Sequence, residues 1–142
     1  MTNRGSDLRG LQHAGRRLVV IGSSTGGPQA LQTVITGLPE HFPCPVVVVQ
    51  HMPAGFTNAL ALRLNNVSRV AVREAEHGDV LRSGCVYIAP GNQHLRIRQE
   101  ADVRRIILSH EPPVGNHRPA VNVMYDSVAH LGDDVVAVIL TG

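Results

Sequence analysis

Two residues have the chemical type and the position that ester hydrolysis by a serine requires. Ser24 lies in the segment Gly22-Ser23-Ser24-Thr25-Gly26, which has the G-x-S-x-G spacing of a nucleophile elbow. Glycines on both sides of such a serine leave room for a sharp turn from a strand into a helix, so that the hydroxyl projects from the turn. His51 follows a second apolar run, and an imidazole within hydrogen-bond reach would take the proton of the serine hydroxyl. Ser24 and His51 are therefore a candidate nucleophile and a candidate general base.

The same glycine-rich segment has three other interpretations. Sequence patterns exclude two of them and leave the third open. A phosphate-binding loop of the P-loop type needs Lys after its last glycine, but Pro28 follows Gly27. A dinucleotide-binding turn needs G-x-G-x-x-G, but Ser24 stands at the second glycine position. Ser and Thr are also favoured helix caps, so residues 23–25 could serve only to begin the next helix. A nucleophile and a cap both stay open at this point.

The two candidate residues meet only if their strands are neighbours in a parallel sheet. Residues 18–21 are an apolar strand candidate, followed by a helix candidate at 29–37 and a four-valine run at 45–50. Such an apolar run is typical of a strand buried on both faces, as in parallel sheets. Because a strand-helix-strand crossover makes its two strands parallel, we expect Ser24 and His51 at adjacent carboxyl ends.

The rest of the chain predicts further elements of an α/β fold. Strand candidates lie at residues 70–72 and 85–89, and Thr57 is a candidate cap for the helix after His51. Two runs alternate between apolar and polar side chains, at 94–98 and 103–108, which predicts an antiparallel hairpin at the edge of the sheet. A helix is expected over 120–131, with Pro119 at its first turn, and a buried inner strand over 135–140. The expected architecture has three layers, with a mainly parallel sheet flanked by helices.

Composition narrows the functional classes. The 142 residues are enough for one domain, which we place at 18–142 behind a disordered lead-in or linker remnant at 1–17. A formal net charge of +2 is too small to indicate nucleic-acid binding, and no apolar run approaches the ~20 residues of a membrane span. Cys44 and Cys85 are too few for a disulfide framework, which fits a reduced, cytoplasmic compartment. No histidine pair has a tight metal-ligand spacing with a Cys or Asp partner, so we expect no zinc site. We also expect no cofactor.

Histidines other than His51 are weaker candidates. We expect His77 and His94 in exposed, polar surroundings, whereas His117-Arg118 could line a cleft. The histidine of a generic α/β-hydrolase comes late in the chain, after the acid. That family would need His117 or His130 as the base, so the early position of His51 argues against it.

Taken together, these segments resemble the catalytic domain of the chemotaxis protein-glutamate methylesterases (CheB-type). The resemblance runs from about residue 17 to the last residue in the family's order, and the combination of motifs is highly specific. The matching segments are Ile21-Gly22-Ser23-Ser24-Thr25-Gly26-Gly27, Gln50-His51-Met52-Pro53-x-Gly55-Phe56-Thr57, Glu74-Ala75-Glu76-x-Gly78, Tyr87-Ile88-Ala89-Pro90-Gly91-x-x-His94, Asn116-His117-Arg118-Pro119 and Val138-Ile139-Leu140-Thr141-Gly142.

The resemblance implies both a reaction and its setting. The family hydrolyses γ-glutamyl methyl esters on the cytoplasmic segments of chemoreceptors and also deamidates receptor glutamines, without a cofactor. It implies Ser24 as nucleophile and His51 as general base, with Thr25 at the position of a supporting threonine near the histidine. By analogy with elbow sites, the backbone N–H of Thr25 would donate to the oxyanion. The family also implies a phosphorelay, with a receiver domain upstream of the catalytic domain and a kinase that phosphorylates it.

One departure from the family concerns the third catalytic residue. The family completes its Ser-His-Asp set with an aspartate in a turn just after the Leu-Thr-Gly strand, and this sequence stops at Gly142, before that turn. Asp133 and Asp134 precede the last strand, at the end of the sheet opposite the site. We therefore expect a chain truncated before the catalytic aspartate, with weak or no esterase activity on its own and a tendency to self-associate. The alternatives are a non-catalytic binding module and an inactive fragment of this fold.

Overall fold

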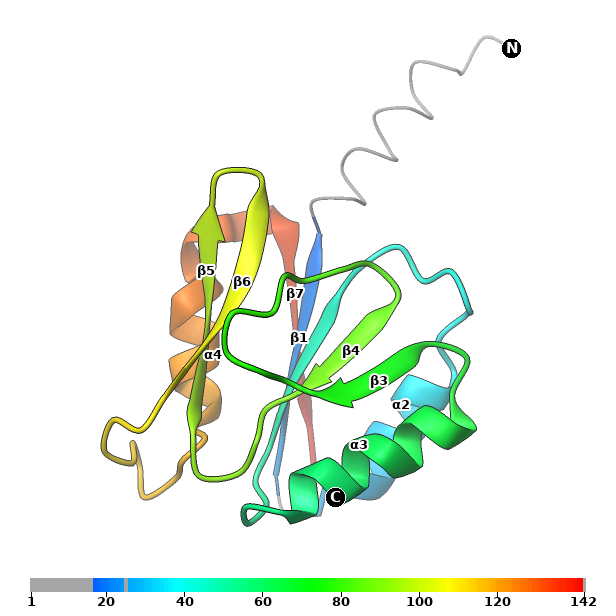
Figure 1. The fold of residues 1–142 in the computed structure, drawn as a ribbon, viewed down its shortest axis with the longest axis horizontal. Coiled ribbons are helices and arrows are strands. Elements are labelled where there is room, and N and C mark those ends of the chain that lie inside the picture. Colours follow the sequence, from blue (N-terminus) through cyan, green and yellow to red (C-terminus); the bar gives the residue numbers. More distant parts are fainter. Residues whose placement is uncertain (1–16, 25, 142) are drawn as a thin grey trace, which may run out of the picture.

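A parallel β-sheet forms the centre of the molecule (Figure 1). The structure, a computed structural model, describes residues 17–24 and 26–141. The sheet has five strands in the order β3-β4-β2-β1-β7, and every neighbouring pair is parallel. The strands are β1 (Leu18–Ser23), β2 (Val46–Gln50), β3 (Ala71–Glu74), β4 (Cys85–Ile88) and β7 (Val135–Leu140). The predicted parallel sheet is confirmed, with β1 extending two residues further than the apolar run.

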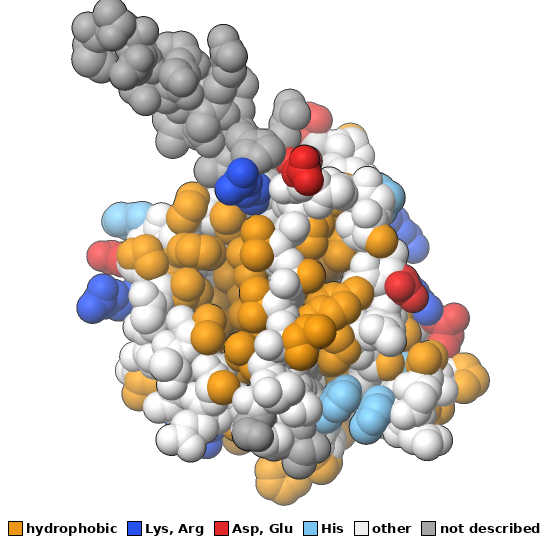
Figure 2. Space-filling model, turned by 180° about the vertical axis from the view of Figure 1, so that it is seen from behind, with side chains coloured by type: hydrophobic (Ala, Val, Ile, Leu, Met, Phe, Trp, Pro, Cys, Tyr) orange, Lys and Arg blue, Asp and Glu red, His pale blue; other side chains and the backbone are white. Residues whose placement is uncertain are grey.

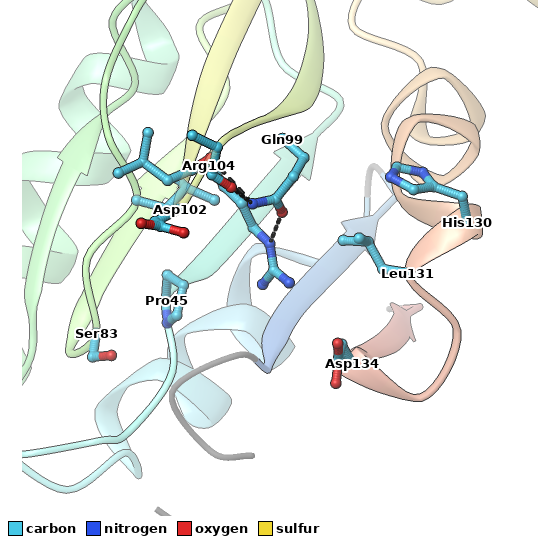
Figure 3. Close-up of a pocket in the computed structure, with 11 residues that line it drawn as sticks. Pro45, Ser83, Gln99, Asp102, Arg104, His130, Leu131 and Asp134 are labelled. Atoms are coloured by element: carbon cyan, nitrogen blue, oxygen red, sulfur yellow. Dashed lines mark hydrogen bonds between the residues drawn. The ribbon is translucent and has the colours of Figure 1, made fainter. Parts of the chain in front are cut away.

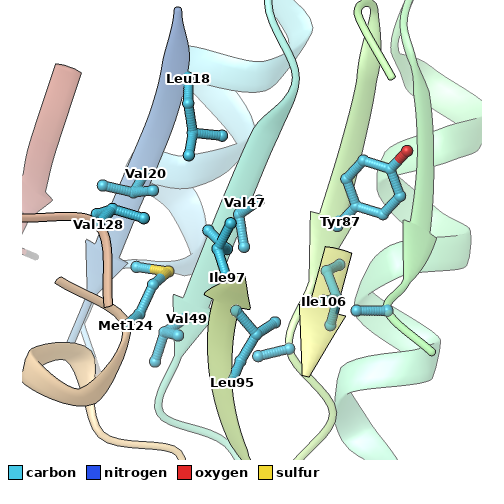
Figure 4. Close-up of a cluster of buried hydrophobic side chains, with 12 residues drawn as sticks. Leu18, Val20, Val47, Val49, Tyr87, Leu95, Ile97, Ile106, Met124 and Val128 are labelled. Atoms are coloured by element: carbon cyan, nitrogen blue, oxygen red, sulfur yellow. The ribbon is translucent and has the colours of Figure 1, made fainter. Parts of the chain in front are cut away.

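Alternate side chains of the central strands pack on opposite faces of the sheet. On one face, Ile21 and Val48 pack against the helices α2 (Pro28–Thr36) and α3 (Phe56–Val67). On the other face, Val20 and Val47 pack against the helix α4 (Val121–Val128) and the hairpin of β5 (His94–Glu100) and β6 (Val103–Ser109), as Figure 4 shows. Each fully buried aliphatic side chain stabilises the fold by about 1.5–3 kcal/mol relative to its exposure, which accounts for the all-valine core of β2.

The structure corrects the expected place of the hairpin. β5 and β6 pair with each other in the predicted antiparallel register, but they form a separate two-stranded sheet instead of extending the edge of the parallel one. Their apolar side chains Leu95, Ile97 and Ile106 are almost fully buried in the core beside Val47 and Val49 (Figure 4). Stacking on the apolar face of the parallel sheet buries most of this side of the hairpin.

Three local expectations also need correction. Thr57 does not cap α3, because the helix begins at Phe56 after Gly55; the Thr57 hydroxyl is buried and donates to Glu74 Oε2 over 2.6 Å. His94 is 1% exposed because a loop covers the start of β5, where His94 Nε2 lies 2.9 Å from the Pro112 carbonyl oxygen. The expected helix over 120–131 is shorter, since α4 ends at Val128 and a 3₁₀ segment η1 (Ala129–Asp134) follows.

Among the described residues the last strand lies at an edge of the sheet, although its apolar sequence predicts an inner strand. Within the described residues, β7 pairs only with β1, and its side chains Val136 and Ile139 are 45% and 72% exposed. Figure 2, which views the molecule from the side where β7 lies, shows hydrophobic side chains gathered on this surface. Among the residues that the structure describes, none of the helices has the length and the hydrophobicity of a membrane span.

Candidate active site

The backbone of Ser24 is held by three hydrogen bonds from different elements. Its N–H donates to the Leu140 carbonyl oxygen of β7 over 3.3 Å. Its own carbonyl oxygen accepts from Gly27 N over 2.8 Å and from the side-chain Nε2 of Gln50 over 2.7 Å. Ser24 is an exposed residue, so neighbouring strands fix the turn while the residue itself stays accessible to solvent.

The helix after this turn does not support the capping interpretation of Ser23 and Ser24. α2 has Gly27 at its N-cap, with no side-chain hydrogen bond to the cap, and Pro28 in its first turn. Proline there needs no N–H partner and has a φ suited to a helix, so the helix begins without a serine cap. The predicted supporting residue Thr25 lies outside the described residues.

His51 lies beside Ser24 because the register of two parallel strands places it there. Ser23 pairs with Gln50 at the ends of β1 and β2, and His51 N–H donates to the Ser23 carbonyl oxygen over 3.2 Å. Ser24 and His51 are therefore the first residues beyond two adjacent strand ends. This arrangement is the one that the crossover pattern predicts, and open α/β folds bind ligands at such ends.

The imidazole of His51 is in a state suited to accepting a proton. The ring is half-buried, and its Nε2 is buried without a hydrogen-bond partner in the described part of the chain. Burial lowers the pKa of His51 below its ordinary value of 6.5, and the charge of His117 lowers it further. A lowered pKa keeps the imidazole neutral at neutral pH, as a general base requires.

Two further polar atoms lie buried and unpaired next to His51. Ser23 Oγ and Gln50 Oε1 belong to side chains that are 1% and 0% exposed, and neither atom has a hydrogen-bond partner among the residues described. An unpaired buried polar atom typically costs about 1–3 kcal/mol. Three such atoms lie at these adjacent strand ends. Polar groups that cost stability in this way are typical of a functional site.

His117 completes the described part of the site. Its ring stacks on that of His51, with ring centroids 4.0 Å apart and planes 4° from parallel. Both histidines line two small hollows, of about 390 and 190 Å³, and Arg118 lines the larger one. The cleft expected at His117-Arg118 is therefore present. Within residues 17–24 and 26–141, no three His, Cys, Asp or Glu side chains gather in a way that could hold a metal ion.

The sequence did not assign a role to Gln50 or a partner to His117. Both lie in segments that carry the family resemblance, Gln50-His51-Met52-Pro53 and Asn116-His117-Arg118-Pro119. Membership in these segments is the sequence signal that could have identified the two residues. The buried Gln50 side chain anchors the carbonyl of Ser24, whereas His117 covers one face of the base.

A larger cavity, of about 490 Å³, lies at the opposite end of the sheet (Figure 3). Pro45, which precedes β2, and Asp134, which precedes β7, both line it, so it adjoins the amino ends of the strands. Within it, Arg104 Nε donates to Gln99 Oε1 over 2.9 Å. Asp134 thus lies away from His51, as the sequence predicts, and does not serve as its carboxylate partner.

Comparison with known proteins places the chain in a family. A sequence model of the CheB methylesterase family matches residues 19–142. A protein-glutamate methylesterase/protein-glutamine glutaminase of Archaeoglobus fulgidus is 51% identical over 125 residues, which are 87% of this chain and 36% of the relative. The equally named protein of Bacillus subtilis is 46% identical over 129 residues, 90% of this chain and 36% of the relative. The chain thus spans about a third of the length of these curated relatives.

A solved structure agrees with the sequence matches. The catalytic domain of the Thermotoga maritima CheB methylesterase superposes with a TM-score of 0.85 at 47% identity, covering 89% of this chain and 67% of that one. The parallel sheet with helices and a separate hairpin is therefore the fold of that domain. The chain belongs to the CheB methylesterase family.

Proposed function

We propose that this chain carries the serine and the histidine of a protein-glutamate methylesterase, which hydrolyses γ-glutamyl methyl esters on chemoreceptors and deamidates receptor glutamines. The observation that carries the proposal is the pairing of Ser23 with Gln50, which puts Ser24 and His51 at adjacent strand ends. The names of the relatives, protein-glutamate methylesterase/protein-glutamine glutaminase, support the same substrate class.

The reaction proceeds in two steps. Ser24 Oγ attacks the ester carbonyl carbon while His51 Nε2 takes the hydroxyl proton, and the tetrahedral intermediate expels methoxide, which takes that proton and leaves as methanol. Water, deprotonated by His51, then attacks the acyl carbon. The bond from this carbon to Ser24 Oγ breaks, His51 returns the proton to Ser24 Oγ, and the glutamate side chain is released. The backbone N–H of Thr25 is the proposed donor to the developing oxyanion.

The proposed setting follows from the substrate. The methylated glutamates lie on cytoplasmic segments of chemoreceptors, so we place the protein in the cytoplasm, with those segments as its partners. A receiver domain upstream of this chain and its kinase are the proposed regulators. The resemblance to the family implies a catalytic aspartate in a turn that follows the Leu140-Thr141-Gly142 segment, and we propose that this carboxylate accepts a hydrogen bond from His51 Nδ1–H.

A substitution of the nucleophile tests the proposal. In the protein expressed with the sequences that flank residues 1–142 in its native gene, Ser24→Ala should lower methanol release from methylated receptor by at least ~10³-fold, because the acyl-enzyme cannot form. The matched control is Ser83→Ala, whose exposed hydroxyl bonds the Pro43 carbonyl oxygen at the other end of the molecule; its rate should match that of the unaltered protein.

A covalent serine probe separates the enzyme from a binding module of the same fold. A fluorophosphonate should label Ser24 in the folded protein, and Ser24→Ala should abolish the labelling. Folded protein that binds methylated receptor but is neither labelled nor active would identify a non-catalytic module. Undiminished turnover by Ser24→Ala would rule out this nucleophile.

A further inference from the structure

The stacked histidine pair contains a residue to which the Ser-His chemistry gives no role. His117 approaches His51 face to face, at a centroid distance of 4.0 Å and an interplanar angle of 4°. At that distance the two rings are in van der Waals contact over their faces. The ring of His51 cannot turn about its bond to Cβ without losing this contact, so His117 restricts the direction in which Nε2 points.

The backbone on the amino side of His117 is a tight turn. Gly115 and Asn116 have φ values of 57° and 65°, and the N–H groups of Val114 and His117 each donate to the other's carbonyl oxygen over 3.0 Å. Two central residues with positive φ inside such a pair are typical of a type I′ turn, a short and well-defined connection. This turn thus defines the backbone conformation from which the His117 side chain extends.

The backbone on the carboxyl side is clamped by a guanidinium group. Arg118 donates from Nε and Nη2 to Asn92 Oδ1, over 3.1 and 2.6 Å, and from Nη1 to the His110 and Glu111 carbonyl oxygens, over 3.0 and 3.3 Å. These four hydrogen bonds join both ends of the 110–118 loop to the turn after β4. The loop therefore holds its histidine against a base that a different part of the chain supplies.

We propose that His117 is a positioning residue for the methylesterase reaction: it stacks on His51 and fixes the imidazole in the orientation that takes the Ser24 proton. This inference rests on the proposed function. It assigns to the 110–118 loop a part of the orienting role that a triad carboxylate has in other serine hydrolases.

Few charged side chains surround the stacked pair. When His51 takes the serine proton it becomes a cation, and a second cation at 4.0 Å would oppose that step. Arg118 is the one charged side chain among the described residues that line the two hollows, and no carboxylate lines either of them. Glu111, in the same loop, turns its carboxylate to Arg96 and Ser109 instead. On α4, Tyr125 donates its hydroxyl hydrogen to the Val138 carbonyl oxygen.

Two substitutions of His117 separate shape from charge. His117→Phe keeps a flat ring against His51 but cannot be protonated, whereas His117→Ala removes the ring. The proposal expects the Phe variant to keep its maximal kcat within about threefold and the Ala variant to lose about ten- to a hundredfold in kcat with little change in KM, because misplacing a catalytic group has costs of that order. His110→Ala, an exposed histidine of the same loop, is the matched control.

The pH profile gives a readout that a merely structural residue would not move. Without the charge of His117 the pKa of His51 should rise, since that charge is one of the two causes that lower it. The acid limb of kcat/KM should then shift to higher pH in His117→Phe. Nuclear magnetic resonance titration of the His51 ring in a Ser24→Ala background should show the same shift, independently of turnover.

The outcomes separate this proposal from the proposed function. If His117→Ala keeps the full kcat, or if His117→Phe loses as much as His117→Ala while both stay folded by circular dichroism, the positioning role is wrong. If His51 titrates at the same pH in the unaltered and the Phe proteins, its electrostatic part is wrong. If Ser24→Ala remains active, the proposed function fails, and the titration of His51 still decides whether the pair is coupled.

Discussion

At the scale of single residues, Gly22 is what lets the site form next to a helix. A Cβ at this position would lie 2.4 Å from Val121 Cγ1 and 3.0 Å from Tyr125 Oη. α4 therefore packs directly on the backbone of β1, two residues before Ser24. The glycine of the G-x-S-x-G pattern is needed here for close packing of the helix as well as for the turn.

Substitution of Gly22 should therefore cost stability. Gly22→Ala should lower the free energy of unfolding by about 1–3 kcal/mol, as overpacked core positions do, measured by urea denaturation. Gly37→Ala is the control, because that glycine has a helical φ of −81° at the end of α2 and its nearest contact would be Thr33 O at 3.3 Å. A loss no larger for Gly22→Ala than for Gly37→Ala would contradict the packing argument.

At the scale of elements, Arg118 fixes the conformation of the 110–118 loop, which carries His117. Its planar guanidinium makes four hydrogen bonds in two directions. A lysine has a single ammonium group on a flexible stem and cannot reproduce this fork. The order of the loop therefore depends on the Arg118 side chain.

Replacement of that side chain should loosen the loop without unfolding the domain. Arg118→Lys should speed amide hydrogen exchange at Val114 and His117 and lower kcat several-fold, with global stability changed by less than ~1 kcal/mol. Arg98→Lys, at an exposed arginine whose ion pair with Glu100 spans 3.5 Å, should leave both measurements unchanged. Unaltered exchange in Arg118→Lys would show that the turn alone fixes the loop.

The sequence predicts the elements better than their placement. The strands of the sheet and the adjacency of Ser24 and His51 follow from apolar runs and crossover geometry, which are local signals. The alternation in residues 94–108 shows that one face of the hairpin is buried, but it does not say against what. The covering of His94 and the stacking of His117 depend on a loop whose path is set by long-range bonds such as Arg118 to Asn92, and no pattern within the loop encodes these bonds.

At the scale of the whole molecule, the described chain ends in an open sheet edge. β7 has a partner on one side only, and it exposes Ile139 and Val136 (Figure 2). Unpaired N–H and C=O groups beside apolar side chains favour pairing with another strand. The self-association that the sequence leads us to expect therefore has a specific surface.

A charge on that surface should suppress the association. A polypeptide of residues 1–142 should show concentration-dependent oligomers by light scattering, and Ile139→Lys should reduce them because a lysine opposes edge pairing. Leu62→Lys, at a side chain of α3 that is 59% exposed, is the control and should have little effect. A monodisperse monomer of the unaltered polypeptide at high concentration would refute this prediction.

The contact between His51 and His117 also has a consequence for how the molecule folds. The first histidine follows β2, whereas the second belongs to a loop that takes its place only after the hairpin and the turn at Asn92 are formed. Contacts between distant segments form late, because closing a long loop costs conformational entropy before the contacts that it allows stabilise the chain. The turn that contains Ser24 can therefore form next to His51 before His117 stacks on the His51 ring. A newly made chain would pass through a stage that has the sheet but not yet the full catalytic geometry.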